Sequence, residues 1–294
     1  MIVGERRVAR VSWIALFLTP GLLGLMIFTI GPIIVSLVLT LFEWDLLTSP
    51  RFVGFDNFSR LWRDAEFWAA LRHTLLFLVG YVPLVMITAL AVALALNERL
   101  RGITALRTAF FIPVVSSWVA VALLWTWLFN PKYGLINYLL QMSHITGPGW
   151  LFDRHWAMPA IILTSVWKDL GFVMVLFLAG LQAIPKDYYE AASLDGAGAF
   201  ERLRSITLPL LGPTTFFVTI ISIINSFQVF DQVWVMTEGG PSGATTVLVE
   251  RVVKHAFSYG EMGYAATISW VLFALVFVVT VVQLRWQRRG SFDV

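Results

Sequence analysis

The stretch "DYYEAASLDGAGAFERLRSITLP", residues 187–209, interrupts an otherwise apolar chain with acids, bases, two glycines and a proline. Just before it, Pro185 suits the first position of a helix, where its missing N–H needs no partner. Asp187 then lies in the first turn, where the helix dipole favours a negative charge. The pattern predicts a short helix that ends at Gly196, a residue free to take the left-handed conformation that closes helices.

A second helix is predicted from residue 199 to about residue 207, and Pro209 is expected to stop it. Small side chains in the first helix and between the two helices leave the backbone open to close approach by another protein; they are Ala191, Ala192, Ala197 and Gly198. Together the two helices and the turn form a compact projection over residues 185–209, which we call the knob. Because the segment is long and carries start and stop signals, we interpret it as a contact element and not as a passive loop.

The rest of the chain has the composition of a multi-pass membrane protein. Of its 294 residues, 58% are hydrophobic and only 13% are charged, against roughly 45–50% and 25% in soluble domains. Several apolar stretches are long enough to cross a hydrocarbon core of about 30 Å. We place six of them, at residues 13–42, 73–96, 108–130, 157–181, 210–235 and 263–284. The predicted fold class is therefore an all-α polytopic membrane protein with six transmembrane helices.

Lysine and arginine counts predict the orientation of these spans. Twelve of these residues fall on the side that holds both termini and the knob, eight fall on the other side, and Lys168 lies inside the fourth span. The excess predicts that the N- and C-termini and the knob are cytoplasmic. The predicted organisation is a cytoplasmic tail at 1–12, a first span with an extracytoplasmic amphipathic segment at 13–72, a core of five spans at 73–285, and a cytoplasmic tail at 286–294.

Several classes of function are excluded or disfavoured by composition. The chain has no cysteine, which excludes disulfides, a thiolate nucleophile and Cys-based metal sites. Its four histidines have no metal-ligand spacing, and no nucleophile–base arrangement suggests an enzyme, so we predict no metal, no bound cofactor and no catalytic residue. The basic residues lie at the ends of apolar runs, as topology signals do, and we expect no nucleic-acid partner.

Polar side chains inside a span are costly and tend to line cavities. The fifth span is the richest in them, with Ser222, Asn225, Ser226, Gln228, Asp231 and Gln232. If this span is one continuous helix, Asn225, Gln228 and Gln232 share a face. Aromatic residues lie between them, and amide hydrogen bonds with aromatic stacking suit sugar hydroxyls. An equal alternative is that these amides bind neighbouring helices, and that Asp231 simply lies near the outer interface.

Other polar residues are weaker candidates for the same pathway. Lys168 and Asp169 are expected either to neutralise each other inside the fourth span or to flank a helix irregularity near Gly171, and a structural role for Lys168 is favoured. Ser116 and Ser117 in the third span, with Ser269 in the sixth, are further candidates.

The knob resembles the EAA motif that marks the inner-membrane permeases of binding-protein-dependent ABC importers. That motif has a Glu-Ala-Ala triplet, a glycine a few residues on and a distal Ile-x-Leu-Pro. The matching residues are Glu190, Ala191, Ala192, Asp195, Gly196, Ile206, Leu208 and Pro209. "FVGFDNF", "LFNPKYGLIN", "VWKDLGFVMVLFLAGLQAIP" and "EGGPSGATTVL" resemble the carbohydrate branch of this family, and the resemblance extends from about Val11 over nearly the whole chain.

The resemblance implies a type I ABC importer permease in a bacterial inner membrane, similar to maltose-type and glycerol-3-phosphate-type permeases. It implies that the knob docks into an ATPase subunit, with contacts through Glu190, Ala191, Ala192, Asp195, Gly196 and Pro209. The expected partners are a second permease, two ATPase subunits that bind ATP and Mg, an extracytoplasmic binding protein and membrane lipid. The chain lacks a GxxxxGK[ST] loop, in agreement with ATP hydrolysis on another subunit.

Three hypotheses remain open at this point: two concern the class of substrate, and one concerns the class of transporter. The cargo is expected to be a sugar or oligosaccharide, and glycerol-3-phosphate or a glycerophosphodiester is the alternative. A phosphate favours an Arg or Lys in the cavity, and apart from Lys168 the spans offer none. A self-contained secondary transporter or channel is the alternative of another class, although no internal repeat is found to support it.

Overall fold

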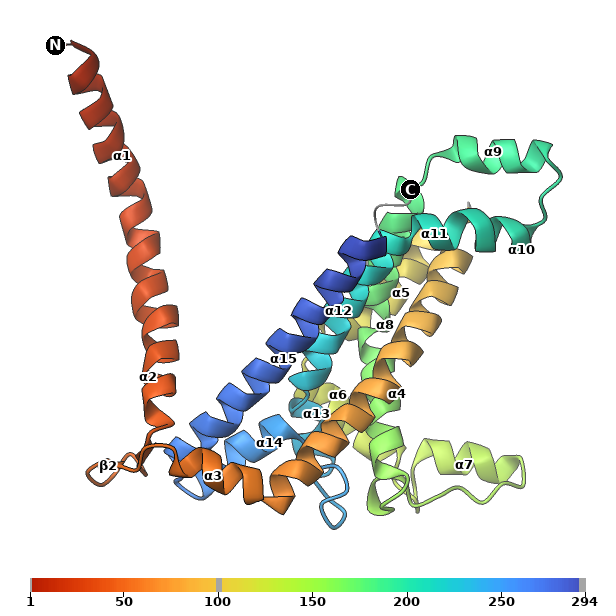
Figure 1. Ribbon diagram of the computed structural model, residues 1–294. Coiled ribbons are helices and arrows are strands. Elements are labelled where there is room, and N and C mark those ends of the chain that lie inside the picture. Colours follow the sequence, from red (N-terminus) through yellow and green to blue (C-terminus); the bar gives the residue numbers. More distant parts are fainter. Residues whose placement is uncertain (1, 99–101, 291–294) are drawn as a thin grey trace. The chain divides into compact units, whose positions relative to one another are not determined.

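The computed structural model describes residues 2–98 and 102–290, and the expected C-terminal tail lies outside them from residue 291 on. Figure 1 shows that the described chain is built almost entirely of helices. It divides into two compact units. The smaller unit comprises Met1–Asp64 and Val252–Val271, and the larger unit comprises Ala65–Arg251 and Leu272–Val294.

The smaller unit begins with a long helical segment and a short hairpin. Its elements are α1 (Ile2–Leu25), the π-helix η1 (Met26–Ile30), α2 (Gly31–Leu39), β1 (Phe42–Glu43), β2 (Arg51–Phe52) and α3 (Asp56–Arg63). The two strands pair antiparallel, and Asn57 on α3 donates to the backbone oxygens of Thr40 and Phe42, which fixes α3 against the hairpin. The expected first span at 13–42 is found as helix up to Leu39, and α1 continues through the segment expected as a tail.

The larger unit contains the remaining helices. In its first half they are α4 (Ala65–Leu96), α5 (Ile103–Val115), α6 (Trp118–Leu128), α7 (Leu135–Met142), the 3₁₀ turn η2 (Trp150–Phe152) and α8 (Ala157–Ala183). In its second half they are α9 (Lys186–Leu194), α10 (Ala199–Arg202), the π-helix η3 (Leu203–Thr207), α11 (Leu208–Leu210), α12 (Gly212–Phe227) and α13 (Asp231–Met236). The last helices are α14 (Leu248–Val253), η4 (Lys254–Ser258) and α15 (Met262–Gly290); α14 and α15 each divide between the two units, and η4 belongs to the smaller one.

Helix α8 is the centre of the larger unit and packs against α4, α5 and α12. Small side chains let the helices approach, since Ala89 and Ala93 on α4 and Ala160 on α8 are fully buried. The crossing with α5 is the closest of these approaches, because a Cβ placed on Gly171 meets the backbone oxygen of Phe110 at 2.1 Å. Alanine and glycine at these points let the helices approach α8 closely, and large apolar side chains such as Met174 and Phe177 fill the core around it.

Among the described residues, four helices are long and apolar enough to cross a membrane, and there are up to six spans if each of two bent helix pairs counts as one. The expected fourth span, 157–181, corresponds to α8, and the second and sixth lie within α4 and α15. The expectation of continuous third and fifth spans is wrong. A bend of 100° separates α5 from α6, and the helix expected at 210–235 stops at Phe227 and resumes at Asp231. The amphipathic segment expected before the second span divides between α3 and the first turns of α4.

Candidate functional site

The break between α5 and α6 is made by two extended serines. Ser116 has ψ 145° and Ser117 has ψ 138°, so the helix cannot continue through them. Pro113 precedes the break and removes a backbone donor from the last turn of α5. Non-helical backbone at membrane depth is tolerated where it is buried in protein or lines a cavity.

The second break follows Phe227 at the end of α12. Gln228 caps α12, and Phe230, with φ −151° and ψ −63°, turns the chain into α13. Helix α13 then packs against α6, so that the short segments that follow the two breaks lie together. The expectation that Asn225, Gln228 and Gln232 lie on one face of a continuous helix is therefore wrong, because the helix ends between them.

The second break nevertheless brings these same residues around one cavity of about 220 Å³, which we call the larger cavity. Its polar lining comprises Tyr81, Asp169, Asn225, Gln228, Asp231 and Gln232, and its aromatic lining comprises Phe77, Trp118 and Phe230. All of them come from the larger unit, from five helices and the second break. The cavity thus combines amide and carboxyl groups with aromatic rings, as expected of a site for a polar, ring-containing ligand.

The amide and carboxyl groups of this lining differ in how they are bonded. Gln232 is buried and donates from Nε2 to Ser165 Oγ on α8 at 3.2 Å, so it ties α13 to α8. Within the described residues, no protein group bonds the side chains of Asn225, Gln228 or Asp231, which are exposed to the cavity. Those three side chains are available to a ligand, whereas Gln232 acts mainly in packing.

Tyr81, Asp169 and Asn225 also line a second cavity of about 80 Å³, the smaller cavity. The Tyr81 hydroxyl donates to Asp169 Oδ2 at 2.8 Å, which joins α4 to α8. Below this hydrogen bond the smaller cavity is lined mainly by apolar side chains of α8 and α12, together with Lys168 and Ser222. The Tyr81–Asp169 pair and Asn225 therefore form the wall that both cavities share.

Lys168 lies at the first break. The residue is 5% exposed, and its ammonium group donates to the backbone oxygens of Pro113 at 3.3 Å and Val114 at 3.1 Å. It also lies over the ring of Trp118, 4.8 Å from the centroid. The positive charge therefore caps the last turn of α5, where the helix dipole favours a cation.

Two alternatives for Lys168 and Asp169 are not found in the described structure. The two side chains form no ion pair, since neighbours on a helix point about 100° apart. Helix α8 continues regularly through Gly171, so there is no irregularity for them to flank. Asp169 bonds Tyr81 instead, and Lys168 holds the end of α5.

We expect Lys168→Met to lower the thermal stability of the purified chain. Removing the ammonium group takes away a donor from the Val114 oxygen and leaves the Pro113 oxygen with the N–H of Ser116, and an unsatisfied buried oxygen costs about 1–3 kcal/mol. The measurement is the melting temperature in detergent, followed by intrinsic fluorescence. Lys132→Met, at an exposed position, is the matched control, and an equal melting temperature for both variants would contradict the capping role.

Ser222 lines the smaller cavity, whereas Ser116 and Ser117 lie beside the cavities and not in them. Ser116 Oγ donates back to the oxygen of Ile112, and Ser117 forms the start of α6. Neither lines either cavity, although Val114 and Trp118 on both sides of them do. Ser269 donates to the oxygen of Ala265 within α15. The serines at positions 116 and 117 thus shape the break that forms the cavity wall.

The knob is a helical hairpin, and its first helix lies where expected, although Pro185 is the N-cap and not the first helical residue. Helix α9 runs from Lys186 to Leu194, and Gly196 follows with φ +80°. The turn is closed by backbone hydrogen bonds from Gly196 to the Ser193 oxygen and from Ala197 to the Ala192 oxygen. Figure 1 shows α9 and α10 side by side, projecting beyond the end of α8.

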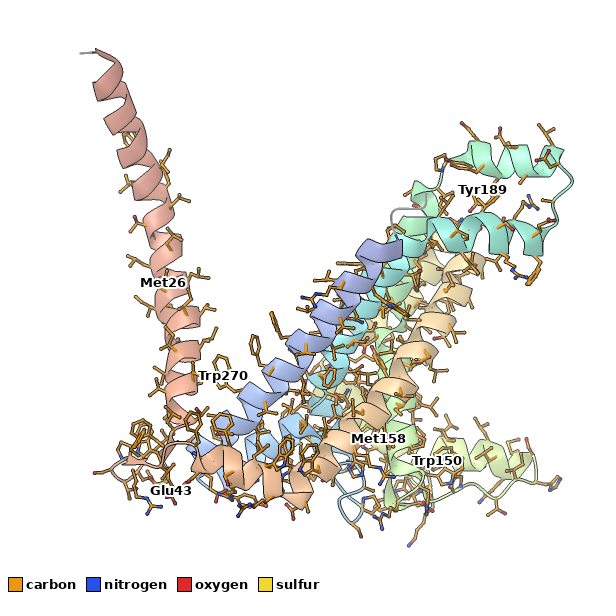
Figure 2. All side chains as sticks on the ribbon, viewed as in Figure 1. Met26, Glu43, Trp150, Met158, Tyr189 and Trp270 are labelled. Atoms are coloured by element: carbon orange, nitrogen blue, oxygen red, sulfur yellow. The ribbon has the colours of Figure 1, made fainter. Side chains whose placement is uncertain are left out.

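Two side-chain contacts hold the returning helix against α9. Figure 2 shows Tyr189 pointing from α9 toward the second helix of the knob, where its hydroxyl lies 3.0 Å from Thr207 Oγ1. Arg202 donates to Ser193 Oγ at 3.2 Å. These contacts fix the distance between the two helices, so that the knob is a defined body.

Pro209 does not stop the second helix, which corrects the expectation. Helix α10 passes into the π-turn η3, where the N–H of Leu208 donates to the oxygen of Leu203, and α11 follows at once. Pro209 lies in the first positions of α11, where the missing N–H is tolerated. The chain bends two residues later, at Leu211, by 64° between the knob and α12.

The far end of the knob presents apolar side chains to solvent. Leu194 is 91% exposed and Phe200 is 74% exposed. Glu190, Ala191 and Asp195 are also exposed, and no protein group bonds the Glu190 carboxylate in the described part of the chain. A rigid projection with an apolar tip and an available carboxylate is suited to insertion into a groove of another protein.

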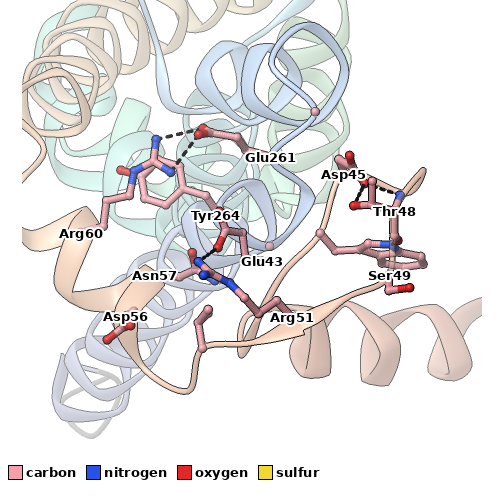
Figure 3. Close-up of a pocket in the computed structure, with 14 residues that line it drawn as sticks. Glu43, Asp45, Thr48, Ser49, Arg51, Asp56, Asn57, Arg60, Glu261 and Tyr264 are labelled. Atoms are coloured by element: carbon pink, nitrogen blue, oxygen red, sulfur yellow. Dashed lines mark hydrogen bonds and ion pairs between the residues drawn. The ribbon is translucent and has the colours of Figure 1, made fainter.

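The smaller unit contains a charged pocket of about 600 Å³ between the hairpin, α3 and the start of α15, shown in Figure 3. Arg60 binds Glu261 through two hydrogen bonds of 2.9 Å and lies over the ring of Tyr264, and Glu43 pairs with Arg51. Burial raises the pKa of Glu261, but hydrogen bonds with Arg60 and His255 outweigh it and hold the pKa below its ordinary value. The charges therefore bind mainly each other and fix α3 on α15.

Several residues of the larger cavity were absent from the sequence prediction. Phe77, Tyr81 and Trp118 come from other helices than the fifth span, and the sequence gives no pairing between them and Asn225. One signal was available for Tyr81, since a hydroxyl inside a span needs a partner. The Arg60–Glu261 pair joins residues 201 positions apart, and nothing local indicates it.

Comparison with known proteins gives three results. Residues 87–289 match the family described as binding-protein-dependent transport system inner membrane component. The chain is 38% identical over 275 residues to the trehalose/maltose transport system permease protein MalF of Thermococcus litoralis, covering 93% of this chain and 92% of that protein. It is also 38% identical over 273 residues to the lactose transport system permease protein LacF of Rhizobium radiobacter, covering 91% of each.

One solved structure has a similar fold over the whole length. It is the bacterial alginate ABC transporter in complex with a periplasmic protein bound to an alginate pentasaccharide. The TM-score is 0.86 at 22% identity, with 98% of each chain covered. At this identity the similarity concerns the fold.

Proposed function

This chain belongs to the family of binding-protein-dependent transport system inner membrane components, and from that premise we propose that it is the translocation subunit of an ATP-driven importer for a sugar or oligosaccharide. It passes the substrate by alternating access from an extracytoplasmic binding protein to the cytoplasm. The named relatives transport trehalose or maltose and lactose, which supports a carbohydrate substrate. The family also argues against a self-contained secondary transporter or channel.

The larger cavity is the observation that carries the proposal. Asn225 and Gln228 offer amide donors and acceptors that no protein group occupies in the described structure, and Trp118 and Phe230 offer ring faces. Sugars present hydroxyl groups around an apolar ring face, so they match amides and aromatic rings together. Both helix breaks border this cavity, in agreement with the discontinuous helices that form substrate sites in other transporters.

The charges of the larger cavity favour a neutral sugar over glycerol-3-phosphate or a glycerophosphodiester. Asp169 and Asp231 line it, and the nearby cation, Lys168, is bound to the end of α5 and stacked on Trp118. A phosphate group held next to two carboxylates without a free cation is unfavourable. The glycerophosphate alternative is therefore the weaker one.

The knob supplies the contact with the motor. We propose that α9 and the turn at Gly196 dock into a cleft of an ATPase subunit, with Glu190 bound to a basic residue there and Leu194 in an apolar groove. Closure of two such subunits on ATP and Mg then rocks the spans as rigid bodies. The complete transporter has a second permease and two ATPase subunits in a bacterial inner membrane, with the knob and both termini in the cytoplasm. The permease itself performs no catalysis.

Copurification tests the machinery. The chain is extracted from its native membrane in mild detergent, and the associated subunits are identified by mass spectrometry. An ATPase and a second permease are expected. In proteoliposomes, uptake of a radiolabelled oligosaccharide is expected to require both internal ATP and the external binding protein. Uptake by the chain alone, without ATP, would overturn the proposal.

Paired substitutions test the cavity. We expect Asn225→Leu with Gln228→Leu to lower the rate of uptake at subsaturating binding protein roughly tenfold, because each lost hydrogen bond costs about 0.5–1.5 kcal/mol. Gln182→Leu, an exposed amide on α8 outside both cavities, is the control. The substrate itself is identified first by a screen of sugars against the purified binding protein. Equal uptake by the double variant and the control would remove the cavity from the pathway.

A further inference from the structure

Helix α7 exposes an apolar stripe that no part of the described chain covers. Leu135, Tyr138, Leu139 and Met142 are spaced at i, i+3, i+4 and i+7, so they lie on one face of the helix. Tyr138, Leu139 and Met142 are 60%, 53% and 67% exposed. In a soluble protein this face would point inward, and here it points outward.

The rotation of α7 about its own axis is fixed by a buried residue on the other face. Asn137 donates from Nδ2 to the oxygens of Pro131 and Pro148, both at 3.2 Å. Its Oδ1 accepts from Trp150 Nε1 at 2.6 Å. Because all of these partners belong to the larger unit, α7 cannot roll its apolar stripe into the protein without breaking three hydrogen bonds.

The position of α7 matches the end of the membrane-spanning region opposite the knob. Helix α7 precedes the N-terminal end of α8, whereas the knob follows the C-terminal end. Figure 1 shows α7 running away from α8 and steeply inclined to it, as a helix that lies along a membrane surface would be. Figure 2 shows Trp150 beside one end of α7. Trp127, Tyr133 and Trp156 are exposed in the same part of the chain. Tryptophan and tyrosine concentrate where hydrocarbon meets head groups.

Helix α6 and α7 itself present apolar, uncharged side chains to the outside. Helix α6 exposes Val119, Leu123, Leu124 and Trp127. Residues 133–143 contain no Asp, Glu, Lys or Arg, and Lys132 precedes them. A surface for a soluble protein partner usually has a polar rim with charged groups, whereas an interfacial helix needs a continuous apolar face.

From these observations we propose that α7 is an interfacial anchor, with its apolar stripe buried in the outer leaflet of the lipid bilayer. The stripe follows, along the chain, the exposed apolar side chains of α6. Lys132 lies at one end, where its ammonium group reaches the lipid head groups. The anchor fixes the depth in the membrane of the segment between α6 and α8. This inference does not depend on which substrate passes through the larger cavity.

The absence of cysteine gives a direct test, since single cysteines can be introduced without removing any. Leu135→Cys, Leu139→Cys and Met142→Cys are labelled with a nitroxide in the full chain, purified with its associated subunits in nanodiscs of phosphatidylcholine and phosphatidylglycerol. Gln141→Cys, one residue from the stripe and polar in the native chain, is the matched control. Collision with oxygen, which concentrates in lipid, is compared with collision with a water-soluble nickel chelate.

We expect the oxygen-to-nickel ratio at the three stripe positions to exceed that at Gln141→Cys by roughly threefold or more, as for labels inside and outside the hydrocarbon boundary. Equal, high collision with nickel at all four positions would overturn the proposal, because the stripe would then face water. Low collision with both reagents at the stripe would overturn it too, in favour of a protein covering α7. A change at the stripe on adding the binding protein would identify that protein as the occupant instead.

Discussion

Gly196→Val is expected to abolish uptake while the chain remains in the membrane at close to its normal level. Gly196 has φ +80° in the turn of the knob, a conformation that costs a residue with a Cβ about 1–2 kcal/mol and a β-branched residue more. The strain is relieved by opening the turn, which breaks the hydrogen bonds from Gly196 to Ser193 and from Ala197 to Ala192. The apolar tip then no longer has the shape that its partner fits.

Two measurements follow this variant. The first is ATP-dependent uptake in proteoliposomes, which we expect to fall to background. The second is the amount of ATPase subunit that copurifies with the chain, which we expect to fall in parallel. The spans lie outside the knob, so the melting temperature of the chain is expected to change little.

Gly198→Val is the matched control for the turn. Gly198 lies two residues on, with φ −68° and ψ 170°, and a Cβ built there meets nothing within 4 Å. Valine tolerates this extended conformation, so uptake should stay near normal. Normal uptake by Gly196→Val would refute the coupling role of the turn. Equal loss in both variants would mean that the partner needs a small surface there, whatever the backbone conformation.

The knob could be predicted from the sequence because its signals are local. Pro185 starts the first helix and Gly196 ends the turn, and each acts through its own backbone. The error at Pro209 has the same local cause, since a proline is read as a stop unless the preceding turn is known. In the structure the π-turn η3 changes the backbone hydrogen-bond pattern just before the proline. Pro209 therefore falls in the first positions of the next helix, α11.

The helix breaks could not be predicted, because local signals at those positions are ambiguous. Pro113 precedes the first break, yet Pro83 lies inside the unbroken helix α4. The second break, at residues 228–230, contains neither glycine nor proline. Packing of α13 on α6 accompanies it, and that contact joins parts of the chain about a hundred residues apart.

The polar residues of the cavity were found for a reason that does not depend on helix geometry. Asn225, Gln228 and Asp231 are costly in a span whether or not it is continuous, so their type indicated a cavity even though their periodicity was misread. Their partners across the cavity, Tyr81 and Asp169, are 88 positions apart and required the tertiary structure.

Gly171→Ala is expected to prevent normal assembly of the larger unit, although it adds only one methyl group. The added Cβ would lie 2.1 Å from the Phe110 oxygen, 2.8 Å from the Phe110 carbonyl carbon and 3.0 Å from the Phe111 Cα. All three are backbone atoms, so no side-chain rotation relieves the clash. Relief of the clash therefore requires the backbone of α5 to move away from α8.

That movement also weakens the cap at the first helix break. Lys168 lies three residues before Gly171, on the same face of α8, and reaches the Pro113 and Val114 oxygens on α5. Overpacking of a tight contact costs about 1–3 kcal/mol and sometimes more. Displacing α5 adds the loss of the lysine's hydrogen bonds and alters the position of Trp118 in the larger cavity.

The measurement is the yield of monodisperse protein by fluorescence-detected size exclusion, together with the melting temperature. For Gly171→Ala we expect a large loss of monodisperse protein and a marked fall in melting temperature, greater than for Lys168→Met, because the cap is lost together with the helix contact. Gly212→Ala is the control, since Gly212 begins α12 and a Cβ there meets nothing within 4 Å. Equal yields and melting temperatures for the two alanine variants would show that α5 and α8 are not in backbone contact, and the arrangement of Lys168 at the break would then have to be revised.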